Sequence, residues 1–104
     1  MRYNVSVSDL ACEQYDKFLD YIYYTLLNPL AADSLMQDFD TTINILEEHA
    51  ESFGYCKSER LRKQGFHKIH FRQHRYLFVY RIKKDSVIVE GMYRELQDYE
   101  NSIG

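Results

Sequence analysis

The stretch of sequence that decides the fold is residues 67–81, HKIHFRQHRYLFVYR, together with residues 87–94, VIVEGMYR. In both, apolar and polar side chains alternate with the period of two that is typical of a β-strand with one buried face. Within the first stretch, one strand ends near Arg72 and another begins at Tyr76, and residues 83–86 form a polar turn before the third. The pattern therefore predicts three consecutive strands in a meander.

The sequence before this block predicts one strand and two helices. Residues 3–7 alternate as a strand does, and Ser8 is a suitable N-cap for a helix over about residues 9–27. Asn28-Pro29 then starts a second helix, whose apolar stripe runs from Ala32 to Leu46. The order strand, helix, helix, strand, strand, strand predicts an α+β fold in which a two-helix hairpin packs on one face of a small, mainly antiparallel sheet. We expect the other face to stay open.

The remaining segments carry weaker signals. Residues 55–65 lack a clear period and are expected to form a loop, with a short strand near Arg60 as the alternative. Residues 95–104 are a polar tail that we expect to be at best partly ordered. The 104 residues, 45% of them apolar, suit one domain over residues 1–104. Cys12 and Cys56 lack the spacing of a metal site or a disulfide framework, so we expect both to be reduced.

Positive charge is concentrated in one part of the chain. The net charge is −3, yet residues 57–84 hold ten of the 13 Lys and Arg residues and only one acid, Glu59. Such a segment creates a local positive potential that acidic flanks do not cancel, because screening limits each patch to about 8 Å. The pattern indicates a polyanionic or acidic partner. No apolar run is long enough for a membrane span and no signal peptide is evident, so we expect a cytoplasmic protein without a membrane partner.

The order of elements, the run from His67 to Arg81 and the strand from Val87 to Arg94 resemble those of the RelE/ParE superfamily, the toxins of type II toxin–antitoxin systems. The resemblance extends over about residues 3–99. It implies a toxin that needs no cofactor or metal and that forms a hetero-oligomer with a cognate antitoxin. We expect the antitoxin to lay an acidic or amphipathic segment over the basic face or the helix groove.

The resemblance implies two alternative activities. Our first interpretation is a metal-independent, ribosome-associated mRNA endonuclease; the alternative is a ParE-like, non-enzymatic poison of DNA gyrase. Cleavage through the 2′-hydroxyl needs a base, cations at the phosphate and an acid for the leaving oxygen. Lys68 or His70 would be the base, and Tyr99 or His70 the acid. The candidate catalytic residues are Lys68, His70 and Arg72, which match family members by position, and Tyr99, in place of a tail aromatic; the candidate substrate-binding residues are Arg75, Arg81 and Arg94.

Two positions depart from the nuclease pattern. Leu77 stands where cleaving members often carry Arg, and Arg94 stands where several have His. A guanidinium stays protonated and cannot act as a general acid, so both departures favour the gyrase alternative. A third possibility is a non-toxic binding module whose basic face docks an acidic peptide.

Other polar and aromatic groups have simpler interpretations. We expect the acidic pairs Asp38 with Asp40 and Glu47 with Glu48 to be solvated positions on the second helix. Tyr15, Tyr23, Tyr76 and Tyr80 fall at core or core-edge positions of the pattern, whereas Tyr93 and Tyr99 remain site candidates.

Overall fold

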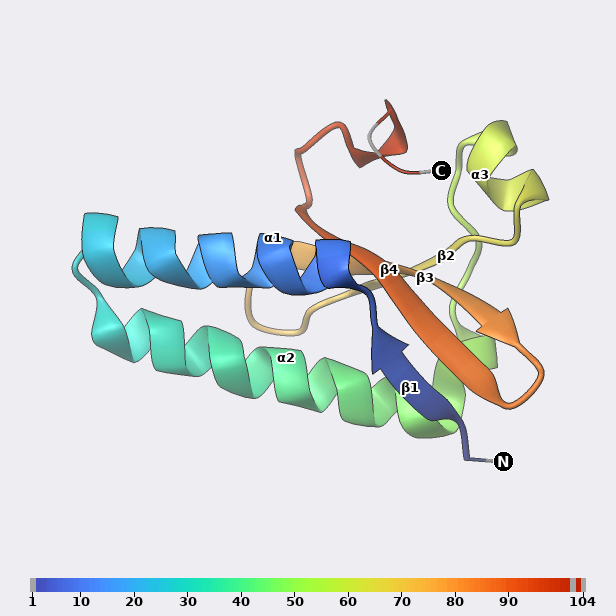
Figure 1. The fold of residues 1–104 in the computed structure, drawn as a ribbon, viewed down its shortest axis with the longest axis horizontal. Helices are drawn as coiled ribbons and strands as arrows, with labels where there is room; N and C mark the ends of the chain where they lie inside the picture. The colour runs from blue at the N-terminus through green and yellow to red at the C-terminus, as the bar shows by residue number, and fades with distance from the viewer. Residues whose placement is uncertain (1, 102, 104) are drawn as a thin grey trace.

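A computed structural model describes residues 2–101 and 103, and its elements follow the predicted order (Figure 1). Strand β1 (Asn4–Val7) leads into helix α1 (Asp9–Asp20), which continues as a π-helical stretch, η1 (Tyr21–Thr25). The chain turns back, and helix α2 (Pro29–His49) runs beside α1 in the opposite direction. The remaining elements are η2 (Ala50–Ser52), α3 (Glu59–Lys63), β2 (His67–His70), β3 (Tyr76–Lys83), β4 (Ser86–Arg94) and η3 (Tyr99–Asn101).

The two long helices begin where their capping residues predict. The Ser8 side-chain oxygen accepts a hydrogen bond from the backbone N–H of Ala11 at 3.1 Å. The Asn28 side chain does the same for Ala31, also at 3.1 Å, and Pro29 occupies the first turn. Among the described residues no helix combines the length and apolar character that crossing a membrane requires.

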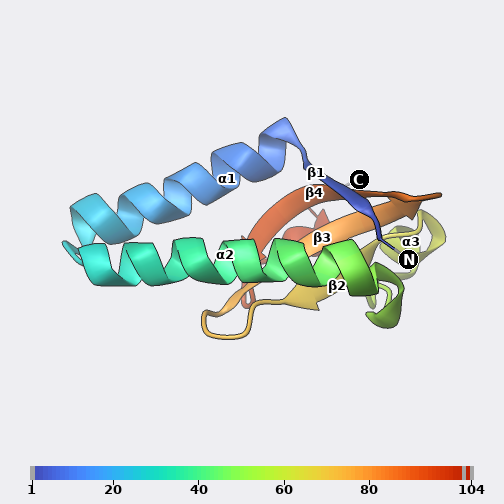
Figure 2. The same cartoon turned by 90° about the horizontal axis from the view of Figure 1, so that it is seen from below.

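The four strands form one mixed sheet in the order β1-β4-β3-β2. The pairs β2–β3 and β3–β4 are antiparallel, as the meander predicts, whereas β1 lies parallel to β4 with Val5 beside Val87. The hairpin of α1 and α2 extends beyond the end of the sheet (Figure 1; Figure 2).

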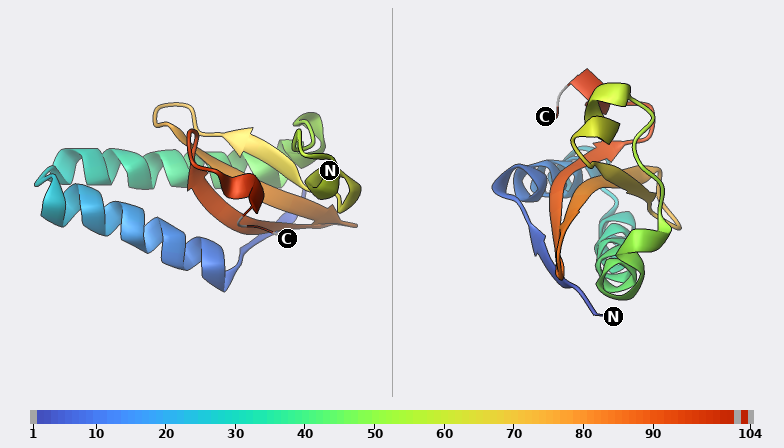
Figure 3. Two further views of the ribbon diagram at one scale, coloured as in Figure 1. Left: turned by 90° about the horizontal axis from the view of Figure 1, so that it is seen from above. Right: turned by 90° about the vertical axis from the view of Figure 1, so that its right-hand side faces the viewer.

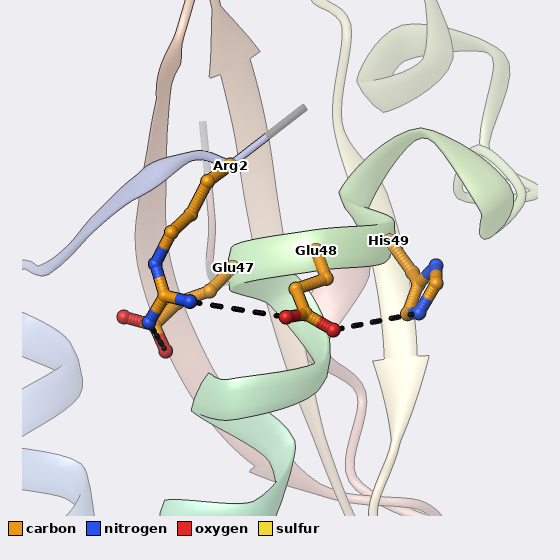
Figure 4. Close-up of polar contacts among 4 residues, drawn as sticks. All are labelled: Arg2, Glu47, Glu48 and His49. Atoms are coloured by element: carbon orange, nitrogen blue, oxygen red, sulfur yellow. Dashed lines mark hydrogen bonds and ion pairs between the residues drawn. The ribbon is translucent and has the colours of Figure 1, made fainter.

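The start of the chain is bound to the end of α2. The backbone N–H of Tyr3 donates to the carbonyl oxygen of Glu47 at 2.7 Å. The Arg2 guanidinium lies 3.4 Å from the Glu47 carboxylate and 3.8 Å from that of Glu48, which in turn faces His49 (Figure 4). The backbone of Glu47 therefore helps to hold the start of the chain against α2, while the Glu48 side chain stays largely exposed, as expected.

The main core lies between the helices and one face of the sheet. Leu35 and Leu46 from α2 are fully buried against Phe78 and Tyr80 from β3. Aromatic rings extend this contact, since Phe39 packs edge-on against Phe78 with ring centroids 5.1 Å apart. The predicted hairpin-on-sheet arrangement is thus confirmed.

The expectation that the second sheet face is open is wrong. Leu77, Val79 and Tyr93 on that face are at most 1% exposed. Short helix α3 and the C-terminal segment cover them, on the side of the sheet away from α2 (Figure 3). The segment 55–65, which we expected to be a loop, thus contains helix α3. The polar tail, which we expected to be at best partly ordered, packs against the sheet through Tyr99 and Ile103. The second core consists of Cys56, Leu61, Phe66, Leu77, Val79, Tyr93, Tyr99 and Ile103.

Candidate functional site

Lys68 and His70 project from β2 on the second sheet face. They lie opposite Val79 and Leu77 of β3, both members of the second core. The His70 ring nitrogen Nδ1 is 2.7 Å from a carboxylate oxygen of Glu95, so this side chain is held by the C-terminal segment. The two basic residues are therefore neighbours along one strand, beside a buried apolar patch.

The Cys56 thiol is buried near Lys68. Burial raises the pKa of this thiol, and the positive charge of the Lys68 ammonium offsets part of that rise. Cys56 is a free cysteine within the second core, while the other free thiol, Cys12, is exposed.

Arg81 is on the same face but is occupied by contacts within the chain. Its guanidinium forms an ion pair with Glu90, in which Nε donates at 2.6 Å. It also lies over the ring of Phe66, 4.8 Å from the centroid. These contacts give Arg81 a structural role at the edge of the second core.

An irregularity in β4 separates Arg94 from these residues. Val79 pairs with Gly91 and the next residue, Tyr80, pairs with Val89, so Glu90 is an extra residue in β4. The alternation of faces shifts there, and Arg94 lies opposite Tyr76, whose ring packs at the helix side of the sheet. A strict period of two along β4 would place Arg94 on the same face as Lys68 and His70, but the bulge moves it to the opposite face.

Tyr99 belongs to the second core. Only 7% of this residue is exposed, and its ring lies 5.7 Å from that of Tyr93, which is 1% exposed. Burial raises the pKa of Tyr99, an effect to which nearby Cys56 adds. The two tyrosines that the sequence leaves as site candidates are therefore both buried.

The basic loop between β2 and β3 is anchored by a buried carboxylate on α2. Asp38 is 4% exposed and accepts hydrogen bonds from the backbone N–H groups of Arg72 at 3.3 Å, Gln73 at 3.0 Å and His74 at 2.9 Å. The His74 ring also meets the Ser34 hydroxyl at 2.9 Å. Asp38 is thus no solvated residue, and this anchor leaves Arg72 and Arg75 exposed at the loop surface.

The sequence does contain a signal that Asp38 is buried, although we expected Asp38 on the polar face of the second helix. Asp38 lies three residues after Leu35 and four before Thr42, both buried on the same helix. A carboxylate at the spacing of the apolar stripe indicates a partner in the interior, because a buried charge requires one.

A cavity of about 450 Å³ opens beside the end of this loop. Arg75 and Arg94 line it, and both are exposed. Tyr76 is half-buried, and its ring packs on Phe18 of α1 with centroids 4.7 Å apart. We call this feature the Arg75–Arg94 cavity; its lining residues are Arg75, Tyr76, Arg94, Glu95, Leu96 and Gln97.

The candidate residues thus fall into separate groups. Lys68, His70 and Arg81 follow the second sheet face, whereas Arg75 and Arg94 meet at the cavity. Arg72 lies exposed on the anchored loop and Tyr99 lies in the second core. The exposed guanidinium groups suit the binding of anionic groups more directly than acid–base chemistry.

Comparisons with known proteins agree with this fold. The family model of the ParE toxin of type II toxin–antitoxin systems, parDE, matches residues 5–94. A solved chain of the chromosomal ParDE TA system from P. aeruginosa is similar over 89% of this chain and 96% of its own, with a TM-score of 0.72 and 18% identity. No curated protein matches the sequence. Since the family model covers most of the chain, this protein belongs to the ParE family of toxins of type II toxin–antitoxin systems.

Proposed function

We propose that this toxin acts by binding DNA gyrase, without cutting RNA, and that a cognate antitoxin neutralises it. The observation that carries the proposal is the match of the ParE family model over residues 5–94. It favours the gyrase alternative over the ribosome-associated endonuclease that was our first interpretation of the sequence.

The geometry of the candidate nuclease residues supports the same choice. Tyr99 is buried with a raised pKa, and His70 is paired with Glu95. Arg94 lies at the other face of the sheet from Lys68. A base and an acid must both reach the reacting oxygens within hydrogen-bond distance, which this arrangement does not favour.

The tip of the helix hairpin offers a surface for the antitoxin. Exposed apolar side chains gather there, and a contiguous apolar patch on a protein surface typically marks an interaction site. Residues of this kind suit an amphipathic segment better than a purely acidic one. The exposed apolar residues from η1 to the start of α2 are Tyr21, Tyr23, Tyr24, Leu26, Leu27 and Leu30.

Two assays on the purified protein test the proposal. We expect it to inhibit supercoiling by purified gyrase holoenzyme while a cell-free translation reaction proceeds and primer extension shows no new cuts in the mRNA. Addition of the antitoxin encoded by the neighbouring reading frame should restore supercoiling. Translation arrest with cleaved mRNA, in the presence of unimpaired supercoiling, would overturn the proposal in favour of the nuclease.

A further inference from the structure

Two cations, Arg75 and Arg94, line the Arg75–Arg94 cavity. Within residues 2–101 and 103, neither guanidinium forms an ion pair, and the carboxylate that lines the cavity, Glu95, is paired with His70 at 2.7 Å. The cavity volume of about 450 Å³ is within the range of binding pockets. Two exposed guanidinium groups that line such a cavity are suited to carboxylate or phosphate oxygens.

The surface of the cavity is mostly apolar. Tyr76 provides its aromatic part, and Leu96, which also lines it, is 95% exposed. The phenol of Tyr21, which is 53% exposed, is close enough to affect the pKa of Tyr76, which burial raises and Arg94 partly lowers. A fully exposed leucine next to a half-buried tyrosine indicates that the natural ligand brings an apolar group as well as negative charge.

The charges around the cavity favour a peptide over a nucleic acid. Helix α1, whose Phe18 packs on Tyr76, carries four acids against the single base Lys17. A nucleic acid strand carries a charge at every phosphate and would meet this acidic helix as it left the cavity. A short peptide can place one or two carboxylates at the guanidinium groups and continue with uncharged residues.

We infer that the Arg75–Arg94 cavity is a docking site for a short acidic segment of the protein that the toxin inhibits. One apolar side chain of that segment would lie between Tyr76 and Leu96, and flanking carboxylates would pair with Arg75 and Arg94. The inference rests on the proposed function, because it takes a protein, gyrase, as the target. Asp38 supports the site indirectly, since it fixes the backbone of the loop that carries Arg75.

The test uses two double variants of the whole chain that lose the same charge. Arg75→Gln with Arg94→Gln empties the cavity of cations. Lys83→Gln with Lys84→Gln removes two exposed cations at the β3–β4 turn, about 23 Å along β3 from Tyr76. We expect the first variant to require at least about tenfold more protein to inhibit supercoiling by gyrase holoenzyme, as loss of central arginines does in other interfaces. The control should stay within about twofold of the unmodified protein.

A third variant examines the apolar wall separately. Leu96→Ser leaves all charges in place, and because Leu96 is almost fully exposed the change should not affect folding. We expect it to weaken gyrase inhibition about fivefold, with an unchanged dependence on salt, because it removes only apolar contact. The arginine variant should instead lose most of the salt dependence.

The outcomes separate this inference from the proposed function. If the unmodified protein does not inhibit gyrase, the proposed function fails, and growth arrest after induction then decides the inference. Arrest by the lysine variant but not by the arginine variant would support the cavity with a different protein target. Equal toxicity of both variants, or a loss of antitoxin binding by the arginine variant while gyrase inhibition persists, would overturn the inference. Circular dichroism and thermal melting establish that each variant is folded.

Discussion

The Asp38 carboxylate accepts a hydrogen bond from the backbone N–H of His74 at 2.9 Å, which binds the middle of α2 to the loop between β2 and β3. Asp38→Asn offers one acceptor oxygen and turns an amide donor toward backbone donors. We expect the free energy of unfolding to fall by about 1–3 kcal/mol. Urea denaturation measures this change, and hydrogen exchange should show faster exchange at Arg72, Gln73 and His74.

The matched control is Asp40→Asn, which changes an exposed carboxylate two residues further along the same helix. Its effect on stability should be small, since exposed charges contribute little. Equal losses in the two variants would contradict the role assigned to Asp38.

Tyr93 and Tyr80 differ in how their hydroxyl groups are satisfied. Among the described residues, the buried Tyr93 hydroxyl has no hydrogen-bond partner, whereas that of Tyr80 donates to the Ala50 carbonyl oxygen at 2.7 Å. Tyr93→Phe should therefore leave stability unchanged or raise it by up to about 1 kcal/mol, while Tyr80→Phe should lower it by about 1–2 kcal/mol. Thermal melting of the two variants provides the comparison, and a larger loss from Tyr93→Phe would show that its hydroxyl is satisfied in solution.

Tyr15 makes the protein sensitive to alkali. Burial, together with nearby Asp40, raises the pKa of Tyr15 from 10.0 to about 12. A phenol whose pKa is higher in the folded state stabilises that state fully below pH 10, and this contribution is lost as the pH rises through about 12. We expect stability to fall over this interval, and the fall to be shallower in Tyr15→Phe. Tyrosinate absorbance and urea denaturation across the same pH range check both statements.

The two thiols should react at very different rates. Cys12 is exposed, whereas Cys56 is buried and its thiol pKa is raised by that burial. One thiol should react with Ellman's reagent at once, and the second only when the second core opens. Cys12→Ser should remove the fast phase and Cys56→Ser should retain it. Rapid reaction of both thiols would mean that α3 and the C-terminal segment do not stay closed over the sheet.

The part of the fold that could be predicted is the part with strong local periodicity. Ile69 and Phe71 alternate with basic residues, and the Asn28-Pro29 pair marks the start of α2 unambiguously. Each of these signals arises from residues close together in the sequence, so the predicted order of elements and the predicted main core are both confirmed.

The second core could not be predicted in the same way. Leu61 is the single buried residue of α3, and Tyr99 and Ile103 are isolated apolar positions in a polar tail. No period can arise from one apolar residue per segment, so the burial of Leu77 and Tyr93 depends on contacts distant in sequence. The bulge at Glu90 is likewise determined by pairing with β3.

The candidate site was predicted in composition but not in arrangement. The excess of cations between residues 57 and 84 is plain in the sequence, and Arg75 and Arg94 do meet at one cavity. Their separation from Lys68 follows from the shifted register of β4, and the pairing of Arg81 with Glu90 follows from their proximity at that bulge. Both depend on the sheet as a whole.

The parallel pairing of β1 with β4 has a consequence for the order of folding. Val5 of β1 pairs with Val87 of β4, so β1 cannot join the sheet until most of the chain has been synthesised. The helix hairpin can form early from local contacts, but closure of the sheet requires chain ends that are far apart in sequence. We therefore expect refolding to be limited by this late closure, and a nascent chain that stops before β4 to lack a completed domain.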